Sequence, residues 1–325
     1  MDFSTTFALA AATLALAAAI VATVACCMRD AKYNALPAAE PSQIDTPPRQ
    51  IDAVLNQARA NQDYFVVYRD LVDEKGKRFD VICVFDGHGD DECINAIRSM
   101  DLRQFFVLPN PCEALYEACR GFKGGATINL FRIYKDCIEN HNIGDSQGKV
   151  FKMVDGTWVI QATSVMHSPD NPDERERLGV HAEYYDRSKG YNNITGPSEI
   201  SSIAPGVSVT FLDAPPRDPL QLMVTQALGH KGLTGCHPEF FSVPIVPGQR
   251  YRVICATDGP WDVLGDFDHN ALCTLSAQGI IDLVRVRYAQ EWNVTHSGVF
   301  AGLPNRKFTY PPSLWDDCAV CICDI

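Results

Sequence analysis

Residues 81–89 read Val-Ile-Cys-Val-Phe-Asp-Gly-His-Gly, and the rest of the sequence is best interpreted outward from this stretch. Its first half is apolar and rich in β-branched residues, which predicts a buried strand. Asp86 follows where that strand should end, and Gly87 behind it allows the backbone to come close to a ligand. The stretch therefore predicts a strand that delivers a carboxylate to a cleft.

The same arrangement occurs at two other places in the chain. Asp258 follows Val-Ile-Cys-Ala-Thr and precedes Gly259, and the pair Asp316 and Asp317 stands just before an apolar run that begins at Cys318. Carboxylate oxygens that converge from several strand ends suit Mg²⁺ or Mn²⁺ better than zinc. Asp-Gly pairs are also common turn sequences, and for any one of these acids alone a simple turn is the favoured interpretation.

Composition and charge restrict the classes of protein that fit. The chain has 325 residues, 46% of them apolar, with 28 Lys and Arg against 40 Asp and Glu, a formal net charge of −12. This apolar content excludes a disordered protein, and the length suits either two average domains or one large β-sandwich or α/β domain. The acidic balance argues against a nucleic-acid partner, because that affinity comes from many Lys and Arg contacts to phosphates. It suits a protein that gathers carboxylates around divalent cations.

The N-terminal region predicts a membrane anchor at residues 1–30. Residues 7–27 carry no charge and are almost entirely apolar, long enough as a helix to cross a ~30 Å hydrocarbon core. A cleaved signal peptide is the main alternative, but no Lys or Arg precedes the apolar run. Arg29 and Lys32 follow it, which predicts a single-pass protein whose C-terminal part faces the cytoplasm. The proline-containing residues 31–50 predict a tether, and residues 51–325 a globular domain.

The globular part reads as many strands with a few helices. Apolar, β-branched runs predict strands at 81–85, 126–133, 157–165, 207–212, 251–257 and 318–324. Helical periodicity appears near 93–100, near 112–119 and after a Ser276 cap. Residues 186–220 are rich in Gly, Pro, Ser and Asn and predict a long loop or flap. This pattern indicates sheets flanked by helices.

The thirteen cysteines mostly lie within apolar runs, and their number is odd. We therefore expect buried thiols in a reducing compartment rather than a disulfide framework. Cys318, Cys321 and Cys323 could suggest half a zinc site. Cys321 and Cys323 share one face of the predicted strand, and no second Cys or His pair stands at a suitable spacing, so zinc is not expected.

Several blocks together resemble the metal-dependent protein serine/threonine phosphatases of the 2C type. Val-Phe-Asp-Gly-His-Gly at 84–89, Ala-Thr-Asp-Gly-Pro-Trp-Asp at 256–262 and Asp-Asp-Cys-Ala-Val at 316–320 resemble signature blocks of that family. Further blocks occur in the family's order at 61–63, 144–146, 171–178 and 226–230. The resemblance covers about residues 55–325. It implies an α+β fold, a β-sandwich of two antiparallel sheets flanked by helices, with a two-metal centre at one end.

The resemblance also implies roles for individual residues of this chain. Asp86 would bridge two Mn²⁺ or Mg²⁺ ions with the Gly87 carbonyl as a further ligand, and Asp258 and Asp316 would hold one of these ions. The positions that match a third, weaker ion site in some members are Asp145, Asp258 and Asp262. Asp63 would orient the attacking water, His88 would act as general acid, and Arg59 is the candidate phosphate-binding residue. The implied activity is hydrolysis of phosphoserine and phosphothreonine in proteins, by a monomer and without a phosphoenzyme.

The sequence departs from the family pattern at four positions. Gln62 stands where the family usually has a Glu that ligates the second ion, and an amide oxygen is a weaker ligand. Arg59 lies four residues before Asp63, whereas the family's phosphate-binding Arg usually lies five before. Gln226 and His230 replace the usual Arg and Asp of a block that supplies no primary metal ligand.

Other mechanisms find little support in the sequence. A cysteine phosphatase needs Cys-x₅-Arg, and no Arg of this chain has a Cys six positions before it. The P-loop motif of kinases and NTPases is absent as well. The alternative that remains open is a catalytically weak pseudophosphatase that binds phosphoproteins at a membrane.

Overall fold

The computed structural model describes residues 49–179, 182–186, 192–195, 207–213, 220–265, 268–296 and 306–325. The chain divides into two units, Met1–Pro48 and Arg49–Ile325, and the described residues all belong to the second. Within them, no helix is both long enough and apolar enough to cross a membrane. The predicted anchor at 7–27 and nearly all of the predicted tether lie outside the described residues.

Two five-stranded antiparallel sheets form the centre of the second unit. The first has the order β1-β19-β16-β8-β9 and consists of β1 (Gln50–Asn56), β19 (Cys318–Asp324), β16 (Tyr251–Ala256), β8 (Gln147–Val154) and β9 (Thr157–Thr163). The second has the order β15-β7-β6-β3-β2 and consists of β15 (Glu239–Pro244), β7 (Cys137–Ile143), β6 (Ile128–Tyr134), β3 (Arg78–Phe85) and β2 (Tyr64–Val72). The antiparallel sandwich expected from the sequence is confirmed.

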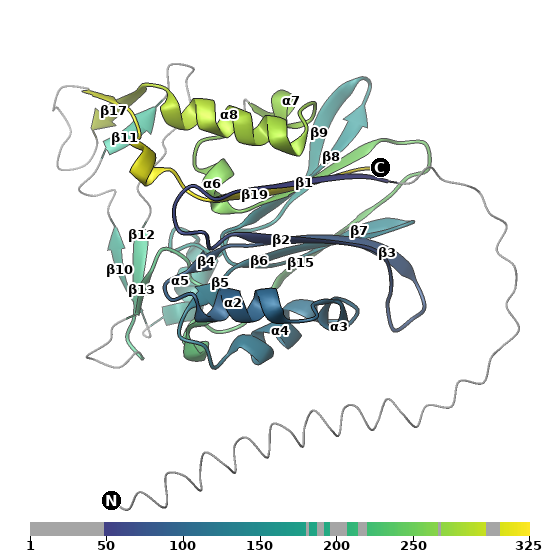
Figure 1. Cartoon of the computed structure of the whole chain (residues 1–325), viewed down its shortest axis with the longest axis horizontal. Coiled ribbons are helices and arrows are strands. Elements are labelled where there is room, and N and C mark those ends of the chain that lie inside the picture. Colours follow the sequence, from purple (N-terminus) through teal and green to yellow (C-terminus); the bar gives the residue numbers. More distant parts are fainter. Residues whose placement is uncertain are drawn as a thin grey trace, which may run out of the picture. The chain divides into compact units, whose positions relative to one another are not determined.

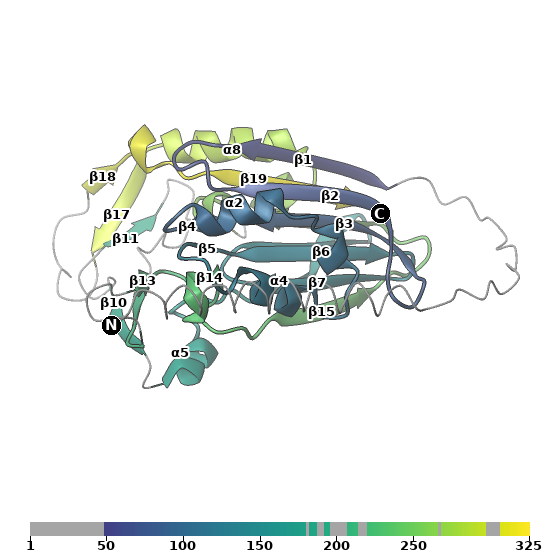
Figure 2. The same ribbon diagram turned by 60° about the horizontal axis from the view of Figure 1, so that its bottom comes forward.

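Helices cover the outer face of each sheet (Figure 1). The helix α8 (Ala277–Ala289) packs on β1 and β19, and the Ser276 hydroxyl caps it by accepting a hydrogen bond from the Gly279 N–H at 3.1 Å. Figure 2 shows α2 (Glu92–Ser99) and α4 (Pro111–Cys119) in front of the second sheet, and the short α3 (Arg103–Phe106) packs against α4. The domain therefore has four layers, helix, sheet, sheet and helix.

Side chains of a strand alternate between its two faces, and in β3 and β19 both faces are buried. In β3, Ile82 and Val84 point into the core between the sheets, whereas Val81, Cys83 and Phe85 pack under α2 and α4. β19 behaves in the same way, with Ala319, Cys321 and Cys323 between the sheets and Cys318, Val320 and Ile322 toward α8. A strand buried on both faces needs a continuous apolar run, which is why these two were readable from sequence.

Three small sheets complete the description. They are β4 (Gly87–His88), β5 (Gly125–Ala126) and β14 (Leu228–Gly229); β10 (Ala182–Asp186), β12 (Val207–Phe211) and β13 (Leu220–Leu222); and β11 (Asn192–Thr195), β17 (Trp292–His296) and β18 (Arg306–Phe308). The remaining helices are α5 (Pro172–Leu178), α6 (Asp258–Trp261), α7 (His269–Leu272) and the 3₁₀ turns His230–Gly232 and Pro312–Leu314. Within 186–220, where the sequence predicts a long loop or flap, the described segments include β11 and β12, which pair with other strands; β12 confirms the strand predicted at 207–212.

The described cysteines are all free thiols, and most of them are buried. Cys318 packs toward α8, whereas Cys321 and Cys323 lie between the sheets. The three sulfurs thus point to opposite faces of β19, as the alternation of a strand requires. Within the described residues they do not gather into a zinc site.

Candidate metal centre and active site

The acids that follow strands meet at one end of the sandwich. Asp86 follows β3, Asp145 lies in the turn between β7 and β8, and Asp258 begins α6 directly after β16. One carboxylate oxygen from each of these three lies within 4.8 Å of the others, and the same holds for Asp258, Asp262 and Asp316. Asp258 therefore belongs to both groups and joins them into one cluster.

The cluster is electrostatically costly without a cation. Burial and the neighbouring Asp316 carboxylate raise the pKa of Asp258 to about 6, and burial and Asp258 raise the pKa of Asp145 to about 8. Burial, with the charges of Asp258, Asp63 and Asp145, raises the pKa of Asp86 well above its usual range. Like charges held this close disfavour ionisation. A bound cation would remove the repulsion.

The glycines after Asp86 and Asp258 are required by close packing and not by a left-handed turn. A Cβ on Gly87 would lie 2.9 Å from Ile94 Cβ and 3.0 Å from the Gln62 carbonyl oxygen. At Gly259 a Cβ would lie 2.2 Å from the Asp317 carbonyl oxygen. Neither glycine has a positive φ. The Asp-Gly pairs are therefore points of close backbone approach, and the simple turn interpretation does not apply to them.

Asp63 lies at the edge of the cluster and is held in place. Its side chain is buried, and its Oδ2 accepts a hydrogen bond of 2.6 Å from the Thr257 hydroxyl. The same hydroxyl oxygen accepts a bond of 2.9 Å from the Ala319 N–H, which ties Asp63 to the ends of β16 and β19. Burial raises the pKa of Asp63 well above its usual value; Thr257 opposes this rise, and the Asp258 carboxylate adds to it. Sequence reasoning missed Thr257, which stands beside Asp258.

Asp317 shapes the loop that precedes Asp63. Its side chain is buried and accepts hydrogen bonds from the Arg59 N–H at 2.7 Å and from the Gln62 N–H at 3.0 Å. Arg98 of α2 donates to the carbonyl oxygens of Asn61 and Asp63. The adjacent residues Asp316 and Asp317 therefore have different roles. Asp316 joins the carboxylate cluster, whereas Asp317 positions a loop.

Gln62 and Arg59 lie near the cluster in different ways. The Gln62 amide donates a hydrogen bond of 2.5 Å to an Asp91 carboxylate oxygen, so its side chain faces Asp91. Arg59 is exposed, and its charge acts on the pKa of Asp316. Despite its shift of one position in sequence, the Arg59 charge lies close enough to Asp316 to oppose the rise that burial causes in the pKa of that carboxyl. Asp91 was not singled out from the sequence.

His88 lies against a second histidine. The rings of His88 and His230 are 4.9 Å apart, and the Nε2 atom of each is buried without a hydrogen-bond partner among the described residues. Gly125 lies next to both rings, since a Cβ there would sit 2.2 Å from His230 Nε2 and 2.9 Å from His88 Nε2. Burial, with the His230 ring, lowers the pKa of His88 to about 3. His88 is thus neutral at pH 7 in this arrangement.

Hydroxyl groups connect Asp86 with the turn that carries Asp145. Thr127 Oγ1 accepts a hydrogen bond of 3.1 Å from the Asp86 N–H and lies 2.6 Å from the Ser146 hydroxyl. Gly144 has a φ of +109°, which glycine adopts most readily, and packs on Thr127. These contacts fix the spacing between β3 and the β7–β8 turn.

Gln226 has a structural role. Its amide donates to Glu174 at 2.8 Å, and its carbonyl oxygen accepts from the His237 N–H at 2.7 Å. Glu174 also receives hydrogen bonds from Thr225 and Arg177. The departure from the family pattern at Gln226 therefore changes a buried network beside α5, whereas the one at His230 brings a ring against His88.

The donor set fits a hard divalent cation. Every side chain in the two groups that meet at Asp258 offers carboxylate oxygens, which Mg²⁺ and Mn²⁺ prefer. The raised pKa values of these acids also indicate a cation site, because a bound cation would offset the same repulsion that now favours protonation. The residues that would hold such ions are Asp86, Asp258 and Asp316, with Asp145 and Asp262 beside them.

Comparison with solved structures shows which fold this is. Similar structures include a C. elegans sex determining protein (18% identity, TM-score 0.55) and a serine-threonine phosphatase 2C from Toxoplasma gondii (16% identity, TM-score 0.53). Each alignment covers 86% of this chain, with 65% of the C. elegans chain and 96% of the Toxoplasma chain. No protein-family model and no curated protein matches the sequence. The domain has the fold of the 2C-type serine/threonine phosphatases.

Proposed function

We propose that this protein is a metal-dependent phosphatase of phosphoserine and phosphothreonine in proteins. One observation supports this above all: within the 2C-type phosphatase fold, Asp258 joins Asp86 and Asp145 to Asp262 and Asp316 in a single carboxylate cluster. A group of acids this close serves no purpose in packing, since charges within the group raise the pKa of Asp86, Asp145, Asp258 and Asp262. Holding divalent cations explains it.

Each residue of the cluster has a part in this proposal. Two ions, and a third where its weaker site fills, would be held by Asp86 with the Gly87 carbonyl, by Asp258 and Asp316, and by Asp145 and Asp262. When bound, Mn²⁺ or Mg²⁺ would neutralise phosphoryl oxygens and lower the pKa of the attacking water. Asp63, fixed by Thr257, would orient that water for in-line attack.

The remaining roles concern the phosphate and the leaving group. Arg59 is exposed beside Asp316, from where its guanidinium would bind phosphoryl oxygens. His88 would donate a proton to the departing serine or threonine oxygen. With a pKa of about 3 it is a neutral imidazole at pH 7 and lacks the second proton of the imidazolium form, so this role requires that a bound dianionic phosphoryl group raise its pKa.

The same histidine favours a second candidate, a catalytically weak pseudophosphatase that binds phosphoproteins. Gln62 turned toward Asp91 and His88 packed against His230 would both lower activity. The discriminating experiment is phosphate release from a phosphothreonine peptide by the full chain, with Mn²⁺ and then with EDTA. Multiple turnovers that EDTA abolishes support the enzyme. Stoichiometric peptide binding without turnover supports the pseudophosphatase.

We also propose that residues 7–27 anchor the chain in a membrane with the phosphatase domain in the cytoplasm, as Arg29 and Lys32 predict. The formal glycosylation sequons at Asn193 and Asn293 test this orientation, because they stay unmodified on the cytoplasmic side. A glycosidase-sensitive mass shift of the full-length protein expressed in eukaryotic cells would reverse the orientation.

A further inference from the structure

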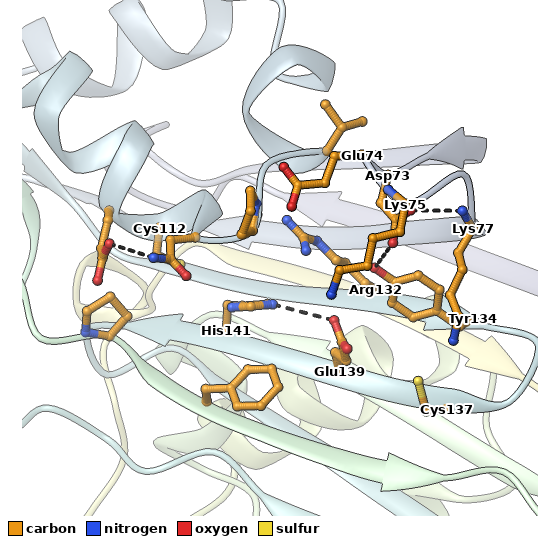
Figure 3. A pocket seen from close by; sticks show the side chains of 16 residues that line it. Asp73, Glu74, Lys75, Lys77, Cys112, Arg132, Tyr134, Cys137, Glu139 and His141 are labelled. Carbon is orange, nitrogen blue, oxygen red and sulfur yellow. Dashed lines mark hydrogen bonds and ion pairs between the residues drawn. The ribbon is translucent and has the colours of Figure 1, made fainter.

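A cavity of about 440 Å³ lies on the helix-covered side of the second sheet. It is bounded by the β2–β3 hairpin, the loop before α4, and strands β6, β7 and β15. Figure 3 shows labelled side chains from the hairpin and from strands β6 and β7 around this cavity, with His141 and Glu139 side by side on β7. Its volume is in the range that holds small organic ligands.

This cavity is separate from the carboxylate cluster. Arg132, in its wall, pairs with Val81 of β3, five residues before Asp86. At the rise of a strand this separation is about 17 Å. None of the acids of the cluster lines the cavity. A ligand bound here would therefore occupy a second site.

Arg132 carries a buried charge that is incompletely compensated. The residue is 3% exposed, and its Nη2 donates to the Leu108 carbonyl oxygen. Its Nε atom has no hydrogen-bond partner among the described residues, and no carboxylate there lies within 4.0 Å of the guanidinium. Glu139 is its cross-strand neighbour without forming that ion pair. Burying a charge without a full set of partners is expensive.

His141 also lines this cavity. His141 is 7% exposed, its Nε2 has no hydrogen-bond partner among the described residues, and the nearest Glu139 oxygen is 3.9 Å away. Its ring lies 5.0 Å from that of Phe240, which is 54% exposed. One donor without a hydrogen-bond partner, an imidazole held only by a long contact with Glu139, and an exposed aromatic ring therefore share one cavity.

Four carboxylates also line the cavity, namely Asp73, Glu74, Glu113 and Glu139. Two of them already have donors, since Asp73 accepts from the N–H groups of Lys75 and Lys77, and Glu113 accepts from Asn110. Lys75 is exposed, and its ammonium forms no ion pair with the described residues. Glu139 contacts His141 at 3.9 Å, and Arg132 Nε and the Lys75 ammonium remain as donors for a ligand.

We propose that this cavity binds a small organic anion. Its phosphate or carboxylate group would accept hydrogen bonds from Arg132 Nε and His141 Nε2 near the Lys75 ammonium, and its ring would stack on Phe240. Charge-assisted hydrogen bonds to an oxyanion are the strongest that such donors make. The inference goes beyond the proposed phosphatase and does not depend on it, because binding can be measured without turnover.

The test is isothermal titration calorimetry of the EDTA-treated full chain with phenylphosphonate, which combines a ring with an oxyanion. Without cations, the carboxylate cluster repels anions, so the cavity is the expected site. Benzoate replaces the phosphonate by a carboxylate, inorganic phosphate omits the ring, and benzylamine reverses the charge. We expect one site for phenylphosphonate or benzoate, weaker binding of phosphate alone, and none of benzylamine. The tighter of the two aromatic anions identifies the oxyanion.

Variants locate the site. Lys75→Glu and Phe240→Ala change exposed side chains and should leave the fold intact, and each should weaken binding of the tighter anion about tenfold. Arg132→Gln should abolish it. Lys307→Glu reverses a charge that is 60% exposed on β18 and serves as the matched control, with unchanged affinity. Failure of both aromatic anions to bind, binding unaffected by both exposed variants, or tighter binding of benzylamine would overturn the proposal.

Discussion

At the scale of single residues, His88 is the position where the structure most directly constrains the proposed chemistry. Its ring is packed against His230, and its pKa falls to about 3. A general acid works best with a pKa near the working pH. The pKa alone therefore does not decide whether His88 donates a proton. A comparison of two substrates decides it, one whose leaving group needs that proton and one whose leaving group does not.

We predict that His88→Ala lowers turnover of a phosphoserine peptide about 10²-fold or more. It should lower turnover of p-nitrophenyl phosphate far less, because p-nitrophenolate leaves as a stable anion. Steady-state rates on the two substrates at saturating Mn²⁺ are the measurement. Equal losses on both, together with a higher Mn²⁺ requirement, would assign His88 a purely structural role beside Asp86.

Gln62 allows a gain-of-function prediction. A carboxylate at this position would stand beside Asp91 and add a charged oxygen near the cluster. Gln62→Glu should therefore lower the Mn²⁺ concentration for half-maximal rate. Gln278→Glu, on the exposed face of α8, adds the same charge far from the cluster and should change nothing. An unchanged Mn²⁺ requirement in Gln62→Glu would mean that position 62 does not face a metal ion.

Sequence reasoning found Asp86, Asp258 and Asp316 because each stands at one end of an apolar run, a local signal. Asp145 and Asp262 were assigned only through the resemblance to the phosphatase family. It could not find Thr257 and Thr127, whose hydroxyls hold Asp63 and Asp86, since those contacts join residues 194 and 41 positions apart. The contact of His88 with His230 was likewise hidden, although His230 was noted as unusual. It depends on the small sheet of β4, β5 and β14, which places Gly125 beside both rings.

At the scale of elements, the loop before β2 depends on Asp317. We predict that Asp317→Ala, which removes two acceptors at a buried position, destabilises the domain by on the order of 3 kcal/mol and raises the Mn²⁺ requirement by displacing Asp63. Thermal unfolding and Mn²⁺-dependent rates measure the two effects. Asp324→Ala breaks a fork with Arg252 elsewhere on β19 and is the control. The prediction fails if both variants change the Mn²⁺ requirement equally.

Some strands could be predicted from the sequence and others could not. β3, β6, β9, β12, β16 and β19 match apolar runs in the sequence, and α2, α4 and α8 match the helical periodicity. β7 was not predicted, because Asn140, His141 and Asn142 interrupt its apolar pattern. Asn140 and Asn142 are buried and hydrogen-bonded to Asn129 on β6. Such paired amides substitute for apolar packing and carry no periodic signal.

At the scale of the whole molecule, the cluster should link stability to pH. The folded-state pKa values of Asp258 (about 6) and Asp145 (about 8) lie above the ordinary value of 3.8. Stability from these protonated acids is present below about pH 4 and is lost as pH rises through 6 to 8. We predict that the metal-free protein loses thermal stability as the pH rises through this window. Added Mn²⁺ should restore that stability, and its stabilising effect should grow as the pH rises.

Differential scanning calorimetry between pH 5 and pH 8.5 measures this, with and without Mn²⁺. Asp258→Asn is the control, since it lacks one of the two groups and should show a shallower decline without metal. A Mn²⁺ stabilisation that is the same at every pH would contradict the linkage.

The central claim is that the acids at the ends of β3, β16 and β19 and in the β7–β8 turn gather to bind divalent cations. The most direct measurement is isothermal titration calorimetry of Mn²⁺ into the EDTA-stripped full chain and into Asp258→Asn. We predict at least two ions per chain for the wild type, and loss of the tightest site in a variant whose circular dichroism is unchanged. Binding of the same number of ions with the same affinity by both proteins would contradict the account.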